Sequence, residues 1–418
     1  MLAVSCLLRR AWLLLILLVT LAAAPLAAQG PAGSEGVEVP GATPHPSSDE
    51  AVVDQPADTP NVVARVDEPT PPPAADEPGA PPAAEEEEEE GATPRVEFRD
   101  GLRITAGPHS AVFRVLSQFR YVYTREDAQH ASTFQLTMLR PSLRASFYDG
   151  LVGVFLQPEL AGDRGRILDA ELTLNLHPAF SVTVGQFITP ASHEFMTPIP
   201  VMMFPDFSIV SVAFREGRDV GGMIRGSFVD GRLAYYVALV NGNGINVPAN
   251  DGVGLTLVSR VEVMPLGAVP YDTTQTLSGH APVRFSVAAG SYVDLVPDGD
   301  AVVGGDATLV AGPFILLAEA YLGWQEGRTT QRRGAYAQVG VTIIPDRLQL
   351  GLRASVLDPN ASLGNDYQRS IEGLVAIYAL GNHAKLNLRY TFTDLGSAST
   401  LAPAPSSHAF TAQIQGWL

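Results

Sequence analysis

The sequence of 418 residues contains almost no cysteine or lysine. Its one cysteine, Cys6, lies in an N-terminal segment that we expect to be removed, so a disulfide framework, a thiolate metal site and a thiol nucleophile are excluded from the mature chain. Only one of the 27 basic residues, Lys385, is a lysine. Long apolar runs are also missing, because after the first thirty residues no segment approaches the ~18 uninterrupted apolar residues that indicate a transmembrane helix.

The N-terminal residues have the pattern of an export signal. Arg9 and Arg10 precede an apolar run over 11–24, which ends in small residues around Ala27 and Ala28. A basic start, a short apolar run and a small-residue cleavage site are typical of a secretory signal peptide. The run is shorter than the ~20 apolar residues that span a bilayer, which disfavours a membrane anchor. We therefore expect residues 1–28 to form a signal peptide.

The next segment, 29–97, is rich in acid and proline. Residues 31–97 hold 17 acidic and two basic residues, whereas 98–418 hold 27 acidic against 23 basic residues, so the negative charge lies mainly ahead of the body. Low hydrophobicity, self-repelling charge and frequent proline predict a disordered linker over 29–97, with a docking tail for a cation or a partner as the alternative. A body so close to neutral is not expected to bind nucleic acid.

From Val112 onward, apolar and polar residues alternate with a period of two, as at Leu172, Thr173 and Leu174. This period indicates strands, and segments of roughly 10 residues suit strands that cross a membrane at a tilt. Sixteen such segments begin near Val112, Thr133, Leu151, Arg166, Phe180, Val220, Arg232, Val253, Val283, Val302, Phe314, Ala335, Leu348, Ser370, Ala384 and Ala409. We therefore expect an all-β fold, a transmembrane antiparallel β-barrel of about 16 strands over 98–418, preceded by a disordered acidic, proline-rich segment.

The connections between these segments alternate between short and long. Asp149-Gly150 and Asp230-Gly231 are strong signals for tight hairpins, whereas 241–252 and 358–368 are long and polar. Short turns at one end and long loops at the other are typical of bacterial outer-membrane barrels. Two irregularities stand out: the connection 265–282 is long although it falls at the short-turn end, and a change of parity near 139–141 requires a β-bulge.

One stretch, about 180–265, combines several short motifs in an ordered spacing. They are Gly185-Gln186-Phe187, Pro190, Glu194, Arg218-Asp219-Val220-Gly221, Gly226, Gly231, Tyr235-Tyr236, Asn241-Gly242, Arg260 and Pro265. With these motifs the chain resembles the phosphate-selective porin O and P family. The resemblance implies a sixteen-stranded outer-membrane channel, typically trimeric, with a loop folded inward to narrow the pore. The lysine cluster by which related members attract anions has no counterpart here, since Lys385 is the one lysine.

The polar face of the strands supplies the candidate pore lining. Rings of like charge in a narrow, water-filled pore set ion selectivity, and an excess of bases favours anions weakly. The predicted lining residues are Arg114, Arg120, Arg144, Arg225, Arg260, Arg353, Lys385 and Arg389. The alternative is that these charges pair across neighbouring strands and brace the wall.

The connection 188–217 is unusually apolar for an exposed loop, with Phe195, Met203 and Phe204 among its residues. A loop that avoids water folds against something, so we expect it to pack inside the barrel as a constriction; burial against a neighbouring subunit is the alternative. The charged residues predicted at the constriction are Glu194, Asp206, Arg215, Glu216 and Arg218.

Enzyme signatures are poor. His193-Glu194 lacks a second histidine at the zinc-binding spacing, and no Gly-x-Ser-x-Gly elbow is present. We therefore expect no catalytic residue, metal or cofactor. The expected partners are outer-membrane lipid and small hydrophilic solutes or anions, with a homotrimer implied by the resemblance. The leading hypothesis is a passive, weakly anion-selective channel of the bacterial outer membrane. The rivals are a plugged or structural barrel with a periplasmic partner and an outer-membrane enzyme.

Overall fold

The computed structural model describes residues 93–418 except 99, 127–128, 163–164, 215–216, 251, 253, 298, 326–328, 365 and 396–405. The expected signal peptide and nearly all of the expected linker lie outside the described residues. No helix among the described residues is both long enough and apolar enough to cross a membrane.

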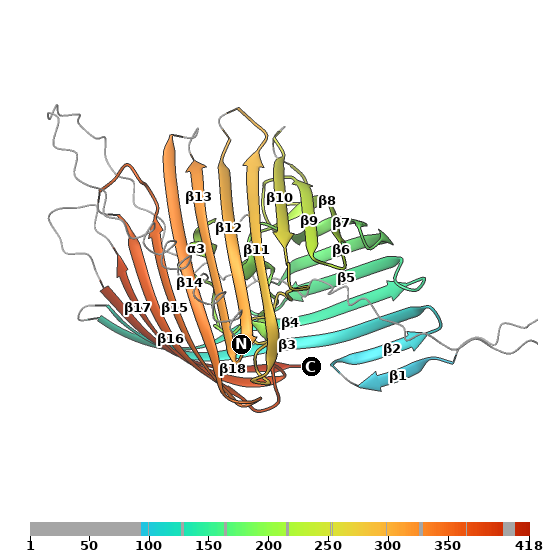
Figure 1. Cartoon of the computed structure of the whole chain (residues 1–418), viewed down its shortest axis with the longest axis horizontal. Coiled ribbons are helices and arrows are strands. Elements are labelled where there is room, and N and C mark those ends of the chain that lie inside the picture. Colours follow the sequence, from blue (N-terminus) through green and yellow to red (C-terminus); the bar gives the residue numbers. More distant parts are fainter. Residues whose placement is uncertain are drawn as a thin grey trace, which may run out of the picture. The chain divides into compact units, whose positions relative to one another are not determined.

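Sixteen antiparallel strands, β3 to β18, form a closed barrel (Figure 1). Each strand pairs with the next along the chain, and β18 pairs with β3 to close the sheet. The strands are β3 (His109–Glu126), β4 (Gln129–Phe147), β5 (Val152–Glu159), β6 (Arg166–His177), β7 (Phe180–Ile188), β8 (Arg218–Phe228), β9 (Leu233–Val240), β10 (Thr256–Val263), β11 (Ala281–Asp294), β12 (Ala301–Gly312), β13 (Phe314–Gln325), β14 (Thr330–Ile344), β15 (Leu348–Asp358), β16 (Gln368–Tyr378), β17 (Ala384–Leu395) and β18 (Ser406–Trp417). The predicted barrel and its sixteen strands are confirmed.

The two faces of the barrel wall differ as the alternation predicts. On β15, Leu350 and Leu352 are exposed on the outer face, whereas Gln349 and Arg353 are buried on the inner face. An outer face of this kind is stable only in contact with lipid, and closure leaves no unpaired sheet edge in the wall. The short turns that join β4 to β5 and β6 to β7 mark the periplasmic end of such a barrel, and the longer connections mark the opposite end.

The register of the described strands shifts at five places, three of them close to the ends of β6, β11 and β14. The other two are bulges that matter for which side chains point inward. The pairing of β3 with β4 shifts at Thr137, because Gln118 pairs with Met138 and Phe119 pairs with Leu136. This confirms the bulge that the change of parity requires, two residues before the predicted position. A second bulge lies at Leu168, which is skipped in the pairing of β5 with β6. Leu168 is therefore buried, although its neighbours Ala170 and Leu172 on the same predicted face are exposed.

A hairpin that the sequence analysis did not predict precedes the barrel. Its strands are β1 (Arg95–Phe98) and β2 (Leu102–Ala106), and β2 pairs with the first residues of β3. The first strand begins inside the stretch that was expected to be linker. The turn contains Asp100 at φ 51° and Gly101 at φ 108°, the left-handed conformations that a tight hairpin needs. An Asp-Gly pair between short alternating runs was a signal that could have found this hairpin.

The connection from β7 to β8 enters the barrel instead of leaving it. It carries three short helices, α2 (His193–Met196), η1 (Ile199–Val201) and α3 (Ile209–Phe214). Figure 1 shows α3 enclosed by the strands, and it contacts β14 and β15 on the far side of the barrel. We call residues 189–214 the lumen loop.

Candidate functional site

Every residue of the lumen loop is buried or half-buried inside the barrel. Its apolar side chains pack against one another and against the wall, as where the rings of Phe195 and Phe207 lie 5.1 Å apart beside Leu116 and Met138. Met203 and Phe204 form a second cluster with Leu374 of β16. The apolar side chains of the loop are therefore shielded from water by one another and by the inner face of the wall.

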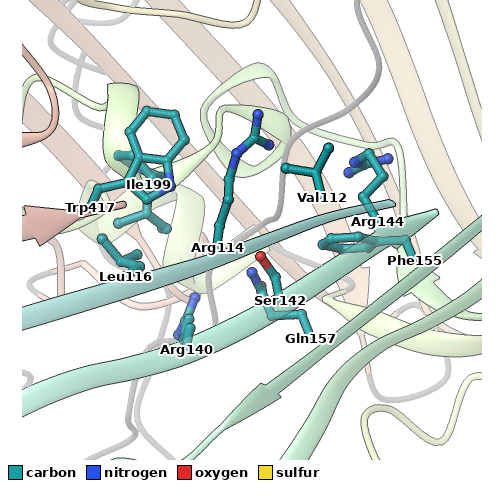
Figure 2. Close-up of a pocket in the computed structure, with 11 residues that line it drawn as sticks. Val112, Arg114, Leu116, Arg140, Ser142, Arg144, Phe155, Gln157, Ile199 and Trp417 are labelled. Atoms are coloured by element: carbon teal, nitrogen blue, oxygen red, sulfur yellow. The ribbon is translucent and has the colours of Figure 1, made fainter. Parts of the chain in front are cut away.

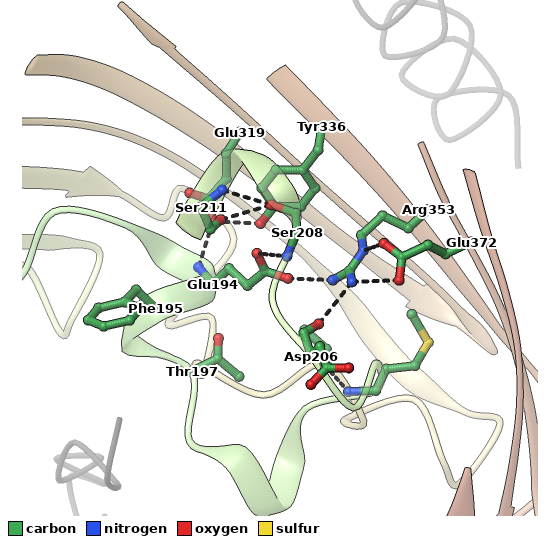
Figure 3. Close-up of polar contacts among 12 residues, drawn as sticks. Glu194, Phe195, Thr197, Asp206, Ser208, Ser211, Glu319, Tyr336, Arg353 and Glu372 are labelled. Atoms are coloured by element: carbon green, nitrogen blue, oxygen red, sulfur yellow. Dashed lines mark hydrogen bonds and ion pairs between the residues drawn. The ribbon is translucent and has the colours of Figure 1, made fainter. Parts of the chain in front are cut away.

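Arg353 of β15 holds the loop through a buried ion triad (Figure 3). Its Nη1 lies 2.7 Å from Oε1 of Glu194 on the loop, and its Nε lies 2.7 Å from Oε1 of Glu372 on β16. The guanidinium also donates to the backbone oxygen of Asp206 at 2.9 Å and stacks 4.4 Å above the Phe204 ring. One wall arginine therefore fixes two separate points of the loop.

Asp206 provides a second ionic attachment. Its Oδ1 accepts from Nη2 of Arg120 at 3.0 Å, and its Oδ2 lies 2.6 Å from Nη2 of Arg389. Burial raises the pKa of the Asp206 carboxyl, but the guanidiniums of Arg389 and Arg120 outweigh it and hold that pKa well below its usual range. Asp206 is therefore ionised at any physiological pH, and it joins β3 and β17 to the loop.

Two further attachments use uncharged loop atoms. Lys385 donates from Nζ to the backbone oxygens of Pro200 and Met202 at 2.8 and 2.7 Å. Glu319 of β13 accepts from Ser192 Oγ at 2.9 Å and from the Glu194 amide at 2.5 Å. The hydroxyl of Tyr336 completes this cluster at 2.8 Å from Glu319. These contacts fix the start of the loop at Ser192 and its middle at Pro200 and Met202.

The long connection at the periplasmic end, 264–280, packs against the lumen loop. Thr273 donates its amide to the backbone oxygen of Val201 at 3.2 Å and accepts from the Met203 amide through Oγ1 at 2.7 Å. Further along, Thr342 of β14 donates from Oγ1 to the backbone oxygen of Thr276 at 2.8 Å. The irregular length noted in the sequence therefore corresponds to a second segment that folds into the barrel mouth.

Arg260 lies beside this second segment in a cluster of acids. Its guanidinium donates to Asp306 at 2.6 and 3.0 Å and to Glu262 at 2.7 Å. His193 of the loop lies 3.7 Å from Asp306, with its ring 4.7 Å from that of Tyr271. Burial lowers the pKa of His193, and Asp306 opposes this shift only in part. A neutral imidazole is therefore expected at pH 7.

The predicted constriction residues occupy different places. Glu194 and Asp206 lie on the lumen loop, whereas Arg218 begins β8 in the wall and donates to Asp169 of β6 at 2.9 and 3.1 Å. Arg215 and Glu216 lie outside the described residues. Of that set, the described loop residues are therefore two acids, and the one described arginine, Arg218, pairs with another wall residue and not with the loop.

The predicted lining residues divide into four groups. Arg120, Arg353, Lys385 and Arg389 hold the lumen loop, and Arg260 is enclosed by acids. Arg225 is half-buried on β8. Arg114 and Arg144 line a cavity of about 30 Å³ at the periplasmic end, between β3, β4 and β5 and the Ile199–Pro200 edge of the loop (Figure 2). Many of these charges are therefore paired, as in the alternative given in the sequence analysis, and several of the pairs join the wall to the loop instead of joining neighbouring strands.

The cavity also contains a residue that the sequence analysis missed. Arg140 points inward from β4 and pairs with Glu159 of β5, with 2.6 Å between Nε and Oε2. The bulge was expected at 139–141, a range that includes Arg140 itself; it lies instead at Thr137, and Arg140 follows it on the inner face. Beside it, the guanidinium of Arg144 lies 4.2 Å above the Phe155 ring. Among the described residues, no group of three or more His, Cys, Asp or Glu side chains could hold a metal ion.

Comparisons with known proteins show likeness of structure without likeness of sequence. No protein-family model and no curated protein sequence matches the chain. OprB of Pseudomonas putida superposes with a TM-score of 0.55 at 9% identity, covering 74% of this chain and 94% of its own. OmpT, an outer membrane protein of Vibrio cholerae in its trimer form, gives 0.52 at 9% identity over 74% and 99% of the two chains. OmpF of Salmonella typhi, in complex with daunomycin, gives 0.52 at 11% identity over 77% and 100%.

The attachment of the loop by Arg353 can be tested by substitution. Replacing Arg353 with methionine leaves Glu194 and Glu372 buried without their cation, and removing one partner of a buried ion pair costs about 3–5 kcal/mol. We expect Arg353→Met to lower the free energy of unfolding by that amount, measured by urea titration in lipid vesicles. The control is Arg333→Met, because Arg333 forms an exposed pair with Asp358 and should cost less than ~1 kcal/mol. Equal losses in the two variants would contradict a structural role for the triad.

The likeness to these structures shows the fold, a membrane-spanning barrel of the bacterial outer-membrane type, and the resemblance to the phosphate-selective porins stays a prediction.

Proposed function

We propose that this chain forms a narrow, passive diffusion channel in the bacterial outer membrane, with a weak preference for small anions. The observation that carries the proposal is the lumen loop, which crosses the barrel and is fixed to β15 and β17 by Arg353 and Arg389. A loop that is fixed inside a closed wall narrows the passage to a defined width. Solutes would move down their gradient, so no covalent step and no cofactor is needed.

The preference for anions rests on the periplasmic cavity. Of the eleven described residues that line it, three are arginines and none is a carboxylate. Arg140 pairs with Glu159 of β5, as Arg260 pairs with Asp306, so the preference rests on the excess of arginine over carboxylate in the lining itself and is expected to be weak. A low-dielectric wall focuses the field of charged lining groups and raises the local concentration of anions. Phosphate is one member of the class of solutes that this lining would favour.

A second candidate function has its own supporting observation. The connection 264–280 packs against the lumen loop through Thr273, and the cavity beside Pro200 has a volume of only about 30 Å³. These features also suit a closed barrel that serves as a structural element and contacts a periplasmic partner. Recording of single channels separates the two candidates.

The channel proposal is tested by recording the refolded protein in a planar bilayer. We expect small conductance steps, and larger steps after removal of residues Ile199–Phe204, because this part of the loop narrows the lumen. A deletion of the same size at 359–364, in the outer connection between β15 and β16, serves as the control and should leave the steps unchanged. A folded barrel that gives no steps, with or without the loop deletion, would refute the channel and favour the structural barrel.

The anion preference is tested under a salt gradient. Replacing Arg114 and Arg144 together by glutamine should lower the ratio of anion to cation permeability toward one, because the focused field weakens. Arg347→Gln is the matched control, since Arg347 is exposed at the same end on the turn between β14 and β15. A reversal potential that is unchanged in the double variant would remove these two arginines from the selectivity argument.

We also propose that the barrel assembles as a homotrimer. The resemblance to a typically trimeric family and the fold shared with OmpT, whose structure is of a trimer form, support this assembly. Native mass spectrometry from mild detergent should show a species of three chains. A monomer that persists at every protein concentration would contradict the proposal.

A further inference from the structure

The hairpin β1–β2 occupies a place in the wall that β18 leaves open. β18 pairs with β3 from Glu126 down to Leu116, and β2 pairs with the same edge of β3 from Phe113 to His109. The hairpin therefore continues the row of β18 beyond its last paired residue, toward the periplasmic end. Figure 1 shows β1 and β2 at this end, beside β3.

The side chains of the hairpin continue the outer face of the barrel residue by residue. Phe98 pairs with Leu102, Leu102 with Phe113, Phe113 with Leu143, and Leu143 with Leu156. Their exposed fractions are 73%, 37%, 44%, 39% and 40% in the order Phe98, Leu102, Phe113, Leu143, Leu156. Because directly paired residues point to the same side of a sheet, this row runs unbroken from the hairpin onto three barrel strands.

The neighbouring row repeats the pattern. Val96 pairs with Ile104, Ile104 with Ala111, Ala111 with Ala145, and Ala145 with Val154. All five are apolar, and the two hairpin residues are exposed. Both rows continue positions on the outer face of β3, β4 and β5, although Ala145 in the second row is itself buried.

The opposite face of the hairpin is polar. Arg95 and Glu97 form an ion pair, and Arg103 pairs in register with Glu97. The hairpin is thus amphipathic with a period of two. The described strands all belong to one sheet, so no second sheet among the described residues covers the apolar face of the hairpin. Two-stranded hairpins are marginal in water by themselves, and an exposed apolar face would make this one a site of aggregation.

Two contacts hold the hairpin turn against the barrel rim. Arg114 donates from Nε to the backbone oxygen of Asp100 at 2.8 Å. His383, on the turn between β16 and β17, lies 3.2 Å from the Asp100 carboxylate through Nε2. The hairpin is therefore part of the wall, and its apolar face has the same orientation as the outer face beside it.

We propose that the apolar face of this hairpin, formed by Val96, Phe98, Leu102 and Ile104, binds the hydrocarbon region of the periplasmic leaflet. The occupant is lipid acyl chain, because the face continues the lipid-facing surface of β3, β4 and β5 in register. The hairpin widens the lipid contact of the barrel at the point where the chain enters the wall. This role does not depend on whether the barrel conducts.

The chain itself provides a clean test, because Cys6 is its one cysteine. In a full-length protein carrying Cys6→Ser, a single cysteine is placed at Phe98 and labelled with an environment-sensitive fluorophore. The protein is reconstituted in phosphatidylcholine vesicles that contain lipids with a nitroxide on the acyl chain. The matched control is Glu97→Cys, the adjacent residue on the polar face, and Leu156→Cys marks the lipid-facing wall.

We expect the nitroxide lipids to quench the label at Phe98 as strongly as the label at Leu156, and the label at Glu97 several-fold less. Iodide in the water should show the reverse order. Equal quenching of Phe98 and Glu97 by lipid, or stronger quenching of Phe98 by iodide, would overturn the proposal. Efficient disulfide crosslinking of unlabelled Phe98→Cys between copies at low protein density would also overturn it, because a second copy would then cover the face.

Discussion

A closed antiparallel sheet in lipid leaves one place for charged side chains, which is its lumen. Side chains alternate along each strand, so the outer half must be apolar and the inner half receives the arginines and carboxylates. Arg353, Glu319 and Glu372 are all buried on the inner face in this way. An ion taken out of water needs a partner, since an unpaired buried charge costs several kcal/mol. The lumen loop meets this requirement for much of the wall.

The loop supplies partners of two kinds, and they act differently. Glu194 and Asp206 give charge to Arg353, Arg120 and Arg389, which fixes where each part of the loop lies. The apolar residues, among them Phe195, supply buried contact area, but such contacts do not require a particular orientation of the loop. Replacing buried ion pairs by apolar residues is often neutral for stability. The pairs therefore matter more for the position of the loop, on which the width of the lumen depends.

The strands could be predicted from the sequence because their period of two depends on neighbours a few residues apart. The burial of the lumen loop also followed from local composition. The partners across the lumen could not be predicted, since Glu194 and Arg353 are 159 residues apart and only closure of the barrel brings them together. The bulge in β4 was expected from the change of parity but lies two residues before the expected place, whereas the bulge at Leu168 was not expected. One skipped residue reverses which side chains point inward, so an error of this size changes the assignment of the neighbouring residues.

The arrangement of the attachments suggests where a solute could pass. Ion pairs hold the loop to β15 and β17, and Glu319 holds its start to β13. The cavity lies elsewhere, between the Ile199–Pro200 edge and strands β3, β4 and β5. At this edge Lys385 and Gln415 both donate to the backbone oxygen of Pro200, and neither contacts a loop carboxylate in these bonds. A solute that needs a wider opening beside the cavity would therefore displace hydrogen bonds to backbone oxygens here, whereas at β15 and β17 it would have to separate buried ion pairs, which costs several kcal/mol.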